Sequence, residues 1–567
     1  MKIKSKIAQI IEKALLQSDI AIESEVVISD ASKVQFGDYQ YNGIMPLAKV
    51  YKSNPREIAS RVVANIELGE WIEKVEIAGP GFINIWLSKQ ALSTTATQYL
   101  TSSRIGVAKT TAPQKIVVDY SGPNMAKEMH VGHLRSSIIG DALVKLFAFL
   151  GHDVIAQNHI GDWGTQFGML IAYLEESGAK QNGELKNLET FYKAAKKRFD
   201  EDDNFANKAR EYVVKIQQGD SHCLKLWESF INISLSHCED VYEKLGVSLT
   251  KEDVRAESFY NDDLSTVIDA LESKSLLELS QGAKCVFIEG KEVPVIVQKG
   301  DGGYLYATTD LAALRYRASM LDANRIVYVV DARQGGHFKD IFDVAKRAGF
   351  VGADVALEHV AFGTMMDKSG KPFKTRDGGT VKLIELLDEA VIKAKEAIKE
   401  RDSYSDEQVE TVAKVVGIGA VKYADLSINR ESNYIFDWDK MLSFDGNTSL
   451  YLQYAYARIS SILKKFDGNI EACEVIVGDE IEHRLVLMIL KLEDVLIKAA
   501  NDSTPHTISA YLYDLTVLFM KFYEQNPILK EDLDPKLKES RIAIAKLSAD
   551  TIKLGLDILG IKVLERL

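Results

Sequence analysis

The stretch from residue 116 to residue 150 constrains the fold of this chain more than any other. An extended, mostly apolar run, Ile116–Tyr120, is followed by a polar loop and then by apolar residues at helical spacing. The helical positions are Leu134, Ile138, Ile139, Leu143, Leu146, Phe147 and Leu150. The loop is therefore predicted to join the carboxyl end of a strand to a helix N-terminus, where unpaired backbone N–H groups and the helix dipole favour an anion such as phosphate.

Two histidines flank a glycine where the loop meets the predicted helix. His130 and His133 are three residues apart, so both rings can point the same way from one turn. Gly132 lacks a Cβ, which lets a flat group approach the backbone closely. An HxxH pattern alone is more often a pair of solvated or capping histidines, so the interpretation depends on the longer string around it.

That string, VDYSGPNMAKEMHVGHLRSSIIGDAL from Val118 to Leu143, resembles the HIGH motif region of class I aminoacyl-tRNA synthetases, in the form found in the bacterial arginyl-tRNA synthetase family. The resemblance implies that L-arginine is activated with ATP to arginyl-adenylate and pyrophosphate, and is then transferred to the 3' end of tRNA(Arg). It implies that Lys127, His130 and His133 are catalytic. The motif comprises Pro123, Asn124, Met125, Ala126, Lys127, Glu128, Met129, His130, Val131, Gly132 and His133.

The segment KPFKTRDGG, residues 371–379, corresponds to the second lysine-bearing loop of class I enzymes, KMSKS, but departs from its pattern. With Phe373 at the methionine position, the second lysine is replaced by Thr375; a slip of one residue would instead place Lys374 there. We adopt the first register because the arginyl family commonly lacks that lysine. The resemblance implies that Lys127 supplies its charge and that activation requires tRNA. The expected ATP-binding residues are His130, Gly132, His133, His337, Lys374, Thr375 and Arg376.

Acidic side chains are expected to select the amino acid, because a guanidinium is best held by carboxylates. Tyr306 and Asp310 are four residues apart at a predicted helix start and so share one face. By resemblance, Asp310 pairs with the guanidinium, Tyr306 packs on it or bonds to it, and Glu257 is a second acid. The full expected arginine-binding set is Asp119, Ser121, Asn124, Glu257, Tyr306, Asp310 and Gln334.

The length of 567 residues and the changes of pattern along the chain predict three domains. Residues 1–108 are predicted to be an α+β unit, with helices at 7–16 and 55–66, a strand at 81–87 and a linker at 101–114. By resemblance this unit contacts tRNA; the alternative is a structural appendage. Residues 109–440 alternate strands and helices, which predicts an α/β, Rossmann-like domain with a parallel sheet and a helical insertion at about 170–285. Its strands are expected at 116–120, 153–158, 284–288, 293–298, 326–330 and 359–363.

Residues 441–567 are predicted to be all α-helical, with helices over NTSLYLQYAYARISSIL and over 482–500, 507–524 and 541–559. The resemblance implies an anticodon-binding bundle; an ordinary dimerisation bundle is the alternative. Tyr454 and Tyr456 are the expected tRNA-binding residues, because their rings could stack on an unpaired base. The alternative is that both rings pack in the core of the bundle.

A net charge of −13 argues against a generic nucleic-acid binder, but it leaves room for one basic face that binds tRNA(Arg). The four cysteines are too scattered for a metal or disulfide framework, and no zinc is expected at His222-Cys223 with His237-Cys238. The other expected partners are L-arginine and ATP with Mg²⁺. We expect a cytoplasmic monomer with no membrane segment. A non-catalytic tRNA-binding paralogue and a synthetase for another amino acid are the alternatives; Lys127, both histidines, and Asp310 with Tyr306 argue against them.

Overall fold

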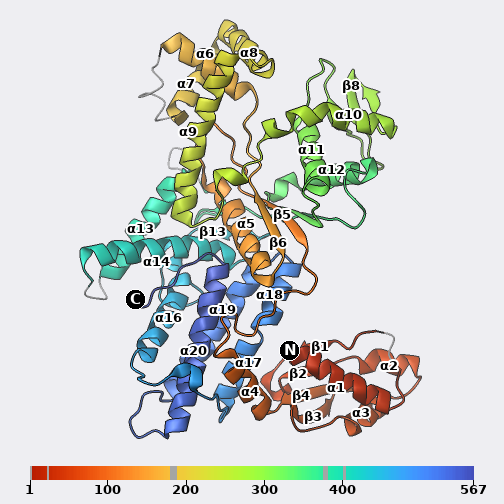
Figure 1. The fold of residues 1–567 in the computed structure, drawn as a ribbon, viewed down its shortest axis with the longest axis vertical. Helices are drawn as coiled ribbons and strands as arrows, with labels where there is room; N and C mark the ends of the chain where they lie inside the picture. The colour runs from red at the N-terminus through yellow and green to blue at the C-terminus, as the bar shows by residue number, and fades with distance from the viewer. Residues whose placement is uncertain (1–2, 22–23, 179–187, 374–380, 400–403) are drawn as a thin grey trace.

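The chain forms an elongated molecule in which a central parallel sheet joins an N-terminal unit, a helical insertion and a C-terminal bundle (Figure 1). The computed structural model describes residues 3–21, 24–178, 188–373, 381–399 and 404–567. The N-terminal unit lies at one end of the long axis beside the bundle, and the insertion helices lie at the other end (Figure 1).

The N-terminal unit is an antiparallel four-stranded sheet, in the order β1-β2-β4-β3, covered by helices. Apolar residues at helical spacing on α1, including Ile7 and Ile11, are buried against it. The α+β prediction for this region is confirmed. The elements are α1 (Ile3–Gln17), β1 (Ile28–Asp30), β2 (Tyr39–Tyr41), α2 (Ile44–Val50), α3 (Pro55–Ala64), β3 (Ile72–Ala78), β4 (Phe82–Leu87) and α4 (Lys89–Tyr99).

The central sheet has four parallel strands in the order β11-β10-β5-β6, which confirms the predicted α/β class. Its register aligns the carboxyl ends of the strands, so that Asp119, Gln157, Tyr328 and His359 lie along one edge. Helices α5 and α12 begin at that edge. The elements are β5 (Lys115–Asp119), α5 (Val131–Leu150), β6 (Asp153–Gln157), α11 (Tyr306–Ser319), β10 (Arg325–Tyr328), α12 (Gly335–Ala348) and β11 (Ala356–His359).

The insertion after β6 is mainly helical, but it ends in a small sheet of its own. The predicted strands near 284–288 and 293–298 exist as β8 and β9, yet they belong to an antiparallel sheet with β7 and not to the parallel sheet. The short connection between them suits a hairpin, whereas a parallel crossover needs a dozen or more residues. The elements are α6 (Thr165–Ser177), α7 (Leu188–Glu201), α8 (Asp203–Gln217), α9 (Ser221–Leu245), α10 (Leu264–Ser273), β7 (Glu278–Ser280), β8 (Ala283–Val286) and β9 (Val295–Gln298).

The described C-terminal residues, 404–567, form helices that pack on the parallel sheet, and no strand follows β13 in this range. Arg325, at the start of β10, donates to the Glu358 carboxylate at 2.8 Å and to the hydroxyl of Ser503, in the turn between α18 and α19, at 2.9 Å. The elements, with those that lead into them, are β12 (Met365–Met366), α13 (Leu383–Lys399), α14 (Asp406–Leu426), β13 (Tyr434–Ile435), α15 (Trp438–Met441), α16 (Ser449–Leu463), α17 (Glu480–Leu490), α18 (Leu492–Asn501), α19 (Pro505–Gln525) and α20 (Pro535–Ile558).

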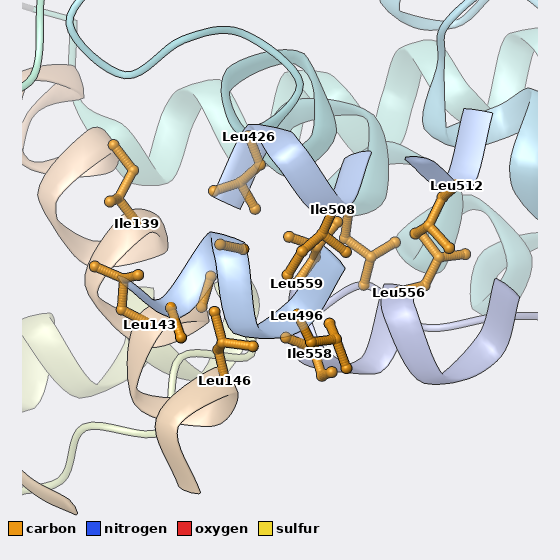
Figure 2. Packing of buried hydrophobic residues seen from close by; sticks show 14 of the residues in the cluster. Ile139, Leu143, Leu146, Leu426, Leu496, Ile508, Leu512, Leu556, Ile558 and Leu559 are labelled. Carbon is orange, nitrogen blue, oxygen red and sulfur yellow. The ribbon is translucent and has the colours of Figure 1, made fainter. Parts of the chain in front are cut away.

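Helix α5 is buried on nearly all sides and forms the centre of the molecule. Its residues Ile139, Leu143 and Leu146 pack with apolar side chains of the C-terminal helices, among them Leu496 and Leu559 (Figure 2). A helix enclosed in this way holds its first turn in a fixed position, so the histidines at its N-terminus are presented by a rigid element.

Several predicted boundaries are wrong, and two of them show why. The strand expected at 359–363 is β11, Ala356–His359, because its pairing ends where β10 ends, at Tyr328. The helix expected at 482–500 is interrupted at Lys491 and forms α17 and α18. Apolar spacing continues across both boundaries and therefore could not reveal them.

Candidate active site

The candidate site lies where the carboxyl edge of the parallel sheet meets the N-termini of α5, α11 and α12. Asp119 ends β5, His130 caps α5, Tyr306 begins α11 and His337 lies in the first turn of α12. Ligands of open α/β sheets bind outside the carboxyl ends of the strands. The structure thus gathers residues from segments more than two hundred positions apart at one edge.

His130 and His133 form a reciprocal cap on α5. The His130 backbone N–H donates to His133 Nδ1 at 3.1 Å, and the Gly132 backbone N–H donates to His130 Nδ1 at 3.0 Å. The two ring centroids are 4.0 Å apart. A Cβ on Gly132 would come within 2.8 Å of the His130 ring, so the glycine is required by this packing as well as by access to the backbone.

Both rings are neutral and present a donor. Burial, together with the nearby Lys127 ammonium, lowers the pKa of His130. Burial and the adjacent His130 ring lower the pKa of His133 to about 3. Because each Nδ1 accepts a backbone N–H, the ring proton sits on Nε2. The helix N-terminus therefore offers two N–H donors in addition to its backbone amides, which suits a phosphate group.

Lys127 is exposed and lies three residues before His130, in the loop that precedes α5. Its Nζ lies 5.2 Å from the ring centroid of Tyr192, on insertion helix α7, a cation–π distance. The residue before it, Ala126, has a φ of 70°, a left-handed conformation that is costly for alanine. The loop is held in this shape from outside, since the Ala126 N–H donates to Ser234 Oγ at 3.0 Å.

Three carboxylates lie in the part of the site that the sequence predicts to bind arginine. Burial, together with the charges of Asp162 and Asp310, raises the pKa of Glu257 to about 7. Burial raises the pKa of Asp162 against the opposing effect of its hydrogen bonds to Ser258, whose N–H and Oγ donate at 2.9 and 2.5 Å. A buried carboxyl whose pKa is raised by burial and by two neighbouring carboxylates, as that of Glu257 is, lies in a site that a bound cation would stabilise.

Asp310 and Tyr306 both face α12. His337 Nε2 lies 2.6 Å from Asp310 Oδ2, and the Tyr306 and His337 ring centroids are 5.0 Å apart. Tyr306 is two-thirds exposed, so its ring is available to a ligand. His337, expected to bind ATP, contacts the expected arginine-binding residues here.

The residues expected to bind the α-amino end differ in their surroundings. Asp119 Oδ2 accepts from Arg317 at 2.8 Å and its Oδ1 accepts from the His159 N–H at 3.2 Å. Ser121 Oγ hydrogen-bonds with Tyr242 at 2.7 Å and is buried. Asn124 is exposed and pairs by backbone bridging with Gly161. Each carboxylate oxygen has a further lone pair, so Asp119 can still accept from a substrate ammonium.

The remaining expected residues lie at the rim of the site, in the bundle or outside the described part of the chain. Gln334 is exposed just before α12. Lys374, Thr375 and Arg376 lie outside the described residues. Tyr454 and Tyr456, on α16, are both half-buried; the Tyr454 ring lies 6.1 Å from that of Phe444, and Tyr456 packs at the edge of the core.

Two residues near the site were missed by the sequence reasoning. Arg317 is fully buried and donates to Gln157 and Asp119, which joins α11 to the strand ends. Asp162 supplies the third carboxylate. Its position five residues after β6 was a usable signal, because polar residues just beyond a parallel strand commonly reach the ligand.

The cysteine–histidine pairs on α9 lie too far apart to share a metal ion. Cys223 and Cys238 are fifteen residues apart on one helix, which corresponds to ~22 Å along its axis. Among the described residues, no group of three or more histidine, cysteine and acidic side chains is placed to hold a metal ion. The helices in the same part of the chain include none with the apolar length that a membrane span requires.

Family models match nearly the whole chain. Residues 95–438 match "tRNA synthetases class I (R), catalytic domain", residues 452–567 match "DALR anticodon binding domain", and residues 1–87 match "Arginyl tRNA synthetase N terminal domain". The chain belongs to the arginyl-tRNA synthetase family.

Individual relatives agree with this assignment over the full length. An arginine–tRNA ligase of Marinomonas sp. is 50% identical over all of both chains, and one of Alteromonas mediterranea is 51% identical over 96% of each. The crystal structure of an arginyl-tRNA synthetase from Plasmodium falciparum superposes with a TM-score of 0.86 at 32% identity, covering all of both chains. The expected family, fold class and enzyme class are confirmed.

Proposed function

We propose that this protein ligates L-arginine to tRNA(Arg) in two steps, and that the first step requires tRNA. The arginine carboxylate attacks the α-phosphorus of ATP, which forms arginyl-adenylate and releases pyrophosphate. A hydroxyl of the terminal ribose of tRNA then attacks the arginyl carbonyl and releases AMP. Membership of the arginyl-tRNA synthetase family supports the overall reaction.

The single observation that carries the first step is the pair of neutral histidines at the N-terminus of α5. Their Nε2–H groups, the backbone amides and the exposed Lys127 ammonium are suited to bind a polyphosphate and to stabilise the charge that develops on it. Such chemistry needs positioning and charge neutralisation and no protein nucleophile. Mg²⁺ is proposed to arrive as the ATP complex.

The carboxylates of Glu257, Asp162 and Asp310 support arginine as the substrate. A guanidinium with its five donors would pair with Glu257 and Asp310 while the Tyr306 ring packs against it. Asp119, Ser121, Asn124 and Gln334 are proposed to hold the α-amino end. A smaller or aliphatic amino acid would leave these carboxylates without a counter-ion, which disfavours it.

The tRNA requirement is proposed because Thr375 replaces the second lysine of the KMSKS loop in the preferred register. Lys127 would then supply that charge to the phosphates, and binding of the tRNA end would complete the site by induced fit. Residues 1–108 and 441–567 are proposed to bind tRNA, with 109–440 as the catalytic domain. We further propose a cytoplasmic monomer, to be checked by cell fractionation and sedimentation equilibrium.

Pyrophosphate exchange with purified full-length protein tests the proposal. Arginine should support exchange with tRNA(Arg) present, whereas lysine and the other amino acids should not. Removing tRNA, or replacing it with tRNA of another specificity, should abolish exchange. Full exchange without tRNA would reject the tRNA requirement alone, and absence of arginine-dependent exchange under all conditions would reject catalysis.

A further inference from the structure

Lys382 joins three separate parts of the molecule beside the HIGH motif. Its Nζ lies 2.8 Å from Glu128 Oε2, in the HIGH loop, and 2.9 Å from Glu189 Oε2, on insertion helix α7. Lys382 itself immediately precedes α13. Partial burial lowers the pKa of Lys382, but the hydrogen bonds to Glu128 and Glu189 outweigh that effect and raise it above its usual value, so the ammonium stays charged.

The backbone holds Lys382 in this place. The Val131 N–H donates to the Val381 carbonyl at 3.0 Å, and the Leu383 N–H donates to the Met129 carbonyl at 2.9 Å. These two bonds pair the residues around Lys382 with those around His130. Main-chain hydrogen bonds therefore fix the backbone of Lys382 beside the histidine cap, within reach of both carboxylates.

Lys127 and Lys382 contact the same face of helix α7. Glu189 and Tyr192 are three residues apart on α7 and so are neighbours on its surface. Glu189 contacts Lys382, and the Tyr192 ring contacts Lys127. Lys127 is thus flanked by Glu128, its neighbour in sequence, and by Glu189, one helical turn from its aromatic contact. In the described part of the chain, Lys127 forms no ion pair with either.

We propose that Lys382 is a positioning residue for adenylate formation. Its ammonium pairs with the carboxylates of Glu128 and Glu189, and this leaves the Lys127 ammonium free for the phosphates of ATP. The inference rests on the proposed function, and it assigns a role to a lysine that does not itself touch the substrate.

Removal of the Lys382 charge would cause the Lys127 ammonium to pair with a neighbouring carboxylate. Glu128 would lose the one ion-pair partner that it has among the described residues, whereas Glu189 would keep Lys193, whose Nζ lies 2.7 Å from its other oxygen. An unpaired carboxylate next to a mobile ammonium attracts it, and a Lys127–Glu128 pair would compete with ATP for the same cation. Glu128 is therefore the principal competitor.

Pyrophosphate exchange at saturating arginine, ATP and tRNA tests the inference by epistasis. Lys382→Met is measured in the wild-type, Glu128→Gln and Lys127→Ala backgrounds. In the wild-type background kcat should fall about tenfold or more. In either of the other backgrounds the further loss should be under about threefold, because the competing carboxylate or the protected ammonium is already absent. Arginine KM should be unchanged throughout.

Controls separate positioning from folding. Lys382→Arg should keep most of the activity. Lys382→Gln should repeat the pattern if the methionine variant melts early. Lys244→Met removes a comparable lysine–carboxylate contact, to Asp388 at 2.6 Å, and should leave kcat unchanged.

Equal losses in all three backgrounds would make Lys382 a structural residue and overturn the inference, as would a wild-type rate for Lys382→Met. A wild-type rate for Lys127→Ala would also overturn it, because Lys127 would not be the group that is protected. Absence of arginine-dependent exchange in the unmodified protein would instead reject the proposed function.

Discussion

His133 accepts the backbone N–H of His130 on its Nδ1 at 3.1 Å, and this hydrogen bond determines that the ring proton is on Nε2, where it can be donated to a ligand. The His130 ring is oriented in the same way by the Gly132 N–H. Each imidazole is therefore both a helix cap and an Nε2–H donor. The interpretation of an HxxH pattern as a capping pair is thus correct, and the same capping orients the two Nε2–H groups that we propose bind phosphate.

The first prediction concerns His133 and acid stability. Its lowered folded pKa, about 3, means that the unfolded chain binds the proton more readily. The resulting contribution to the free energy of unfolding is fully present above the unfolded pKa, about 6.5, and is lost as pH falls from there toward 3. His133→Asn keeps an acceptor but does not titrate. Its urea midpoint should therefore fall less than that of the wild type between about pH 7 and about pH 5. An equal decrease in urea midpoint for the variant and the wild type would contradict a neutral His133 in the folded protein.

The second prediction concerns Lys127 by itself. Lys127→Ala should lower kcat for adenylate formation by about 10²-fold, roughly 2.7 kcal/mol, which is the scale of one lost transition-state contact. Arginine KM should change little, because the ammonium is proposed to face phosphate. Pyrophosphate exchange at varied arginine measures both. A large rise in arginine KM with normal kcat would move Lys127 to the amino-acid side of the site.

The third prediction concerns Glu257 and pH. Arginine should bind the ionised carboxylate, so arginine KM should rise as pH falls below the pKa of about 7, by up to about tenfold per unit. Glu257→Gln should raise KM at about pH 8 and remove this dependence. Arginine KM is measured at several pH values for both proteins. A Gln variant that keeps the wild-type pH dependence would assign the titration to another group.

The fourth prediction concerns Asp310. Asp310→Asn keeps the shape of the side chain but removes its charge, so arginine binding should weaken by about 2–5 kcal/mol while ATP KM stays nearly constant. The same change removes the charge that His337 contacts at 2.6 Å, so the variant's melting temperature serves as the control. A rise in arginine KM of less than about fivefold in a stable variant would leave Glu257 as the leading guanidinium partner.

The fifth prediction concerns the tyrosines of α16. Tyr454 and Tyr456 are half-buried, so each ring has a packed side and a solvent side. If their role is to stack on a tRNA base, alanine at either position should raise tRNA KM and leave the melting temperature nearly unchanged. A core role would instead cost about 3–5 kcal/mol of stability with normal tRNA affinity in the folded fraction.

The sequence by itself determined what depends on neighbouring residues. The strand predicted at 116–120, the helix that follows it and the histidines at their junction follow from local periodicity, and the structure contains all three, with the strand at Lys115–Asp119 and the helix at Val131–Leu150. The position proposed for phosphate binding followed from them, because the carboxyl end of a strand and the N-terminus of the next helix are joined by one loop.

Only the tertiary structure decided what depends on segments far apart in the chain. It placed β8 and β9 in a separate antiparallel sheet, brought Asp162 to Glu257 and Asp310, and set Lys382 between Glu128 and Glu189. None of these relationships has a local signal, because periodicity reports which face of an element is buried and not which element covers it. The effect of one charged group on the pKa of another depends on the distance between them through space. In this site those distances are established only after the insertion and the sheet have packed together.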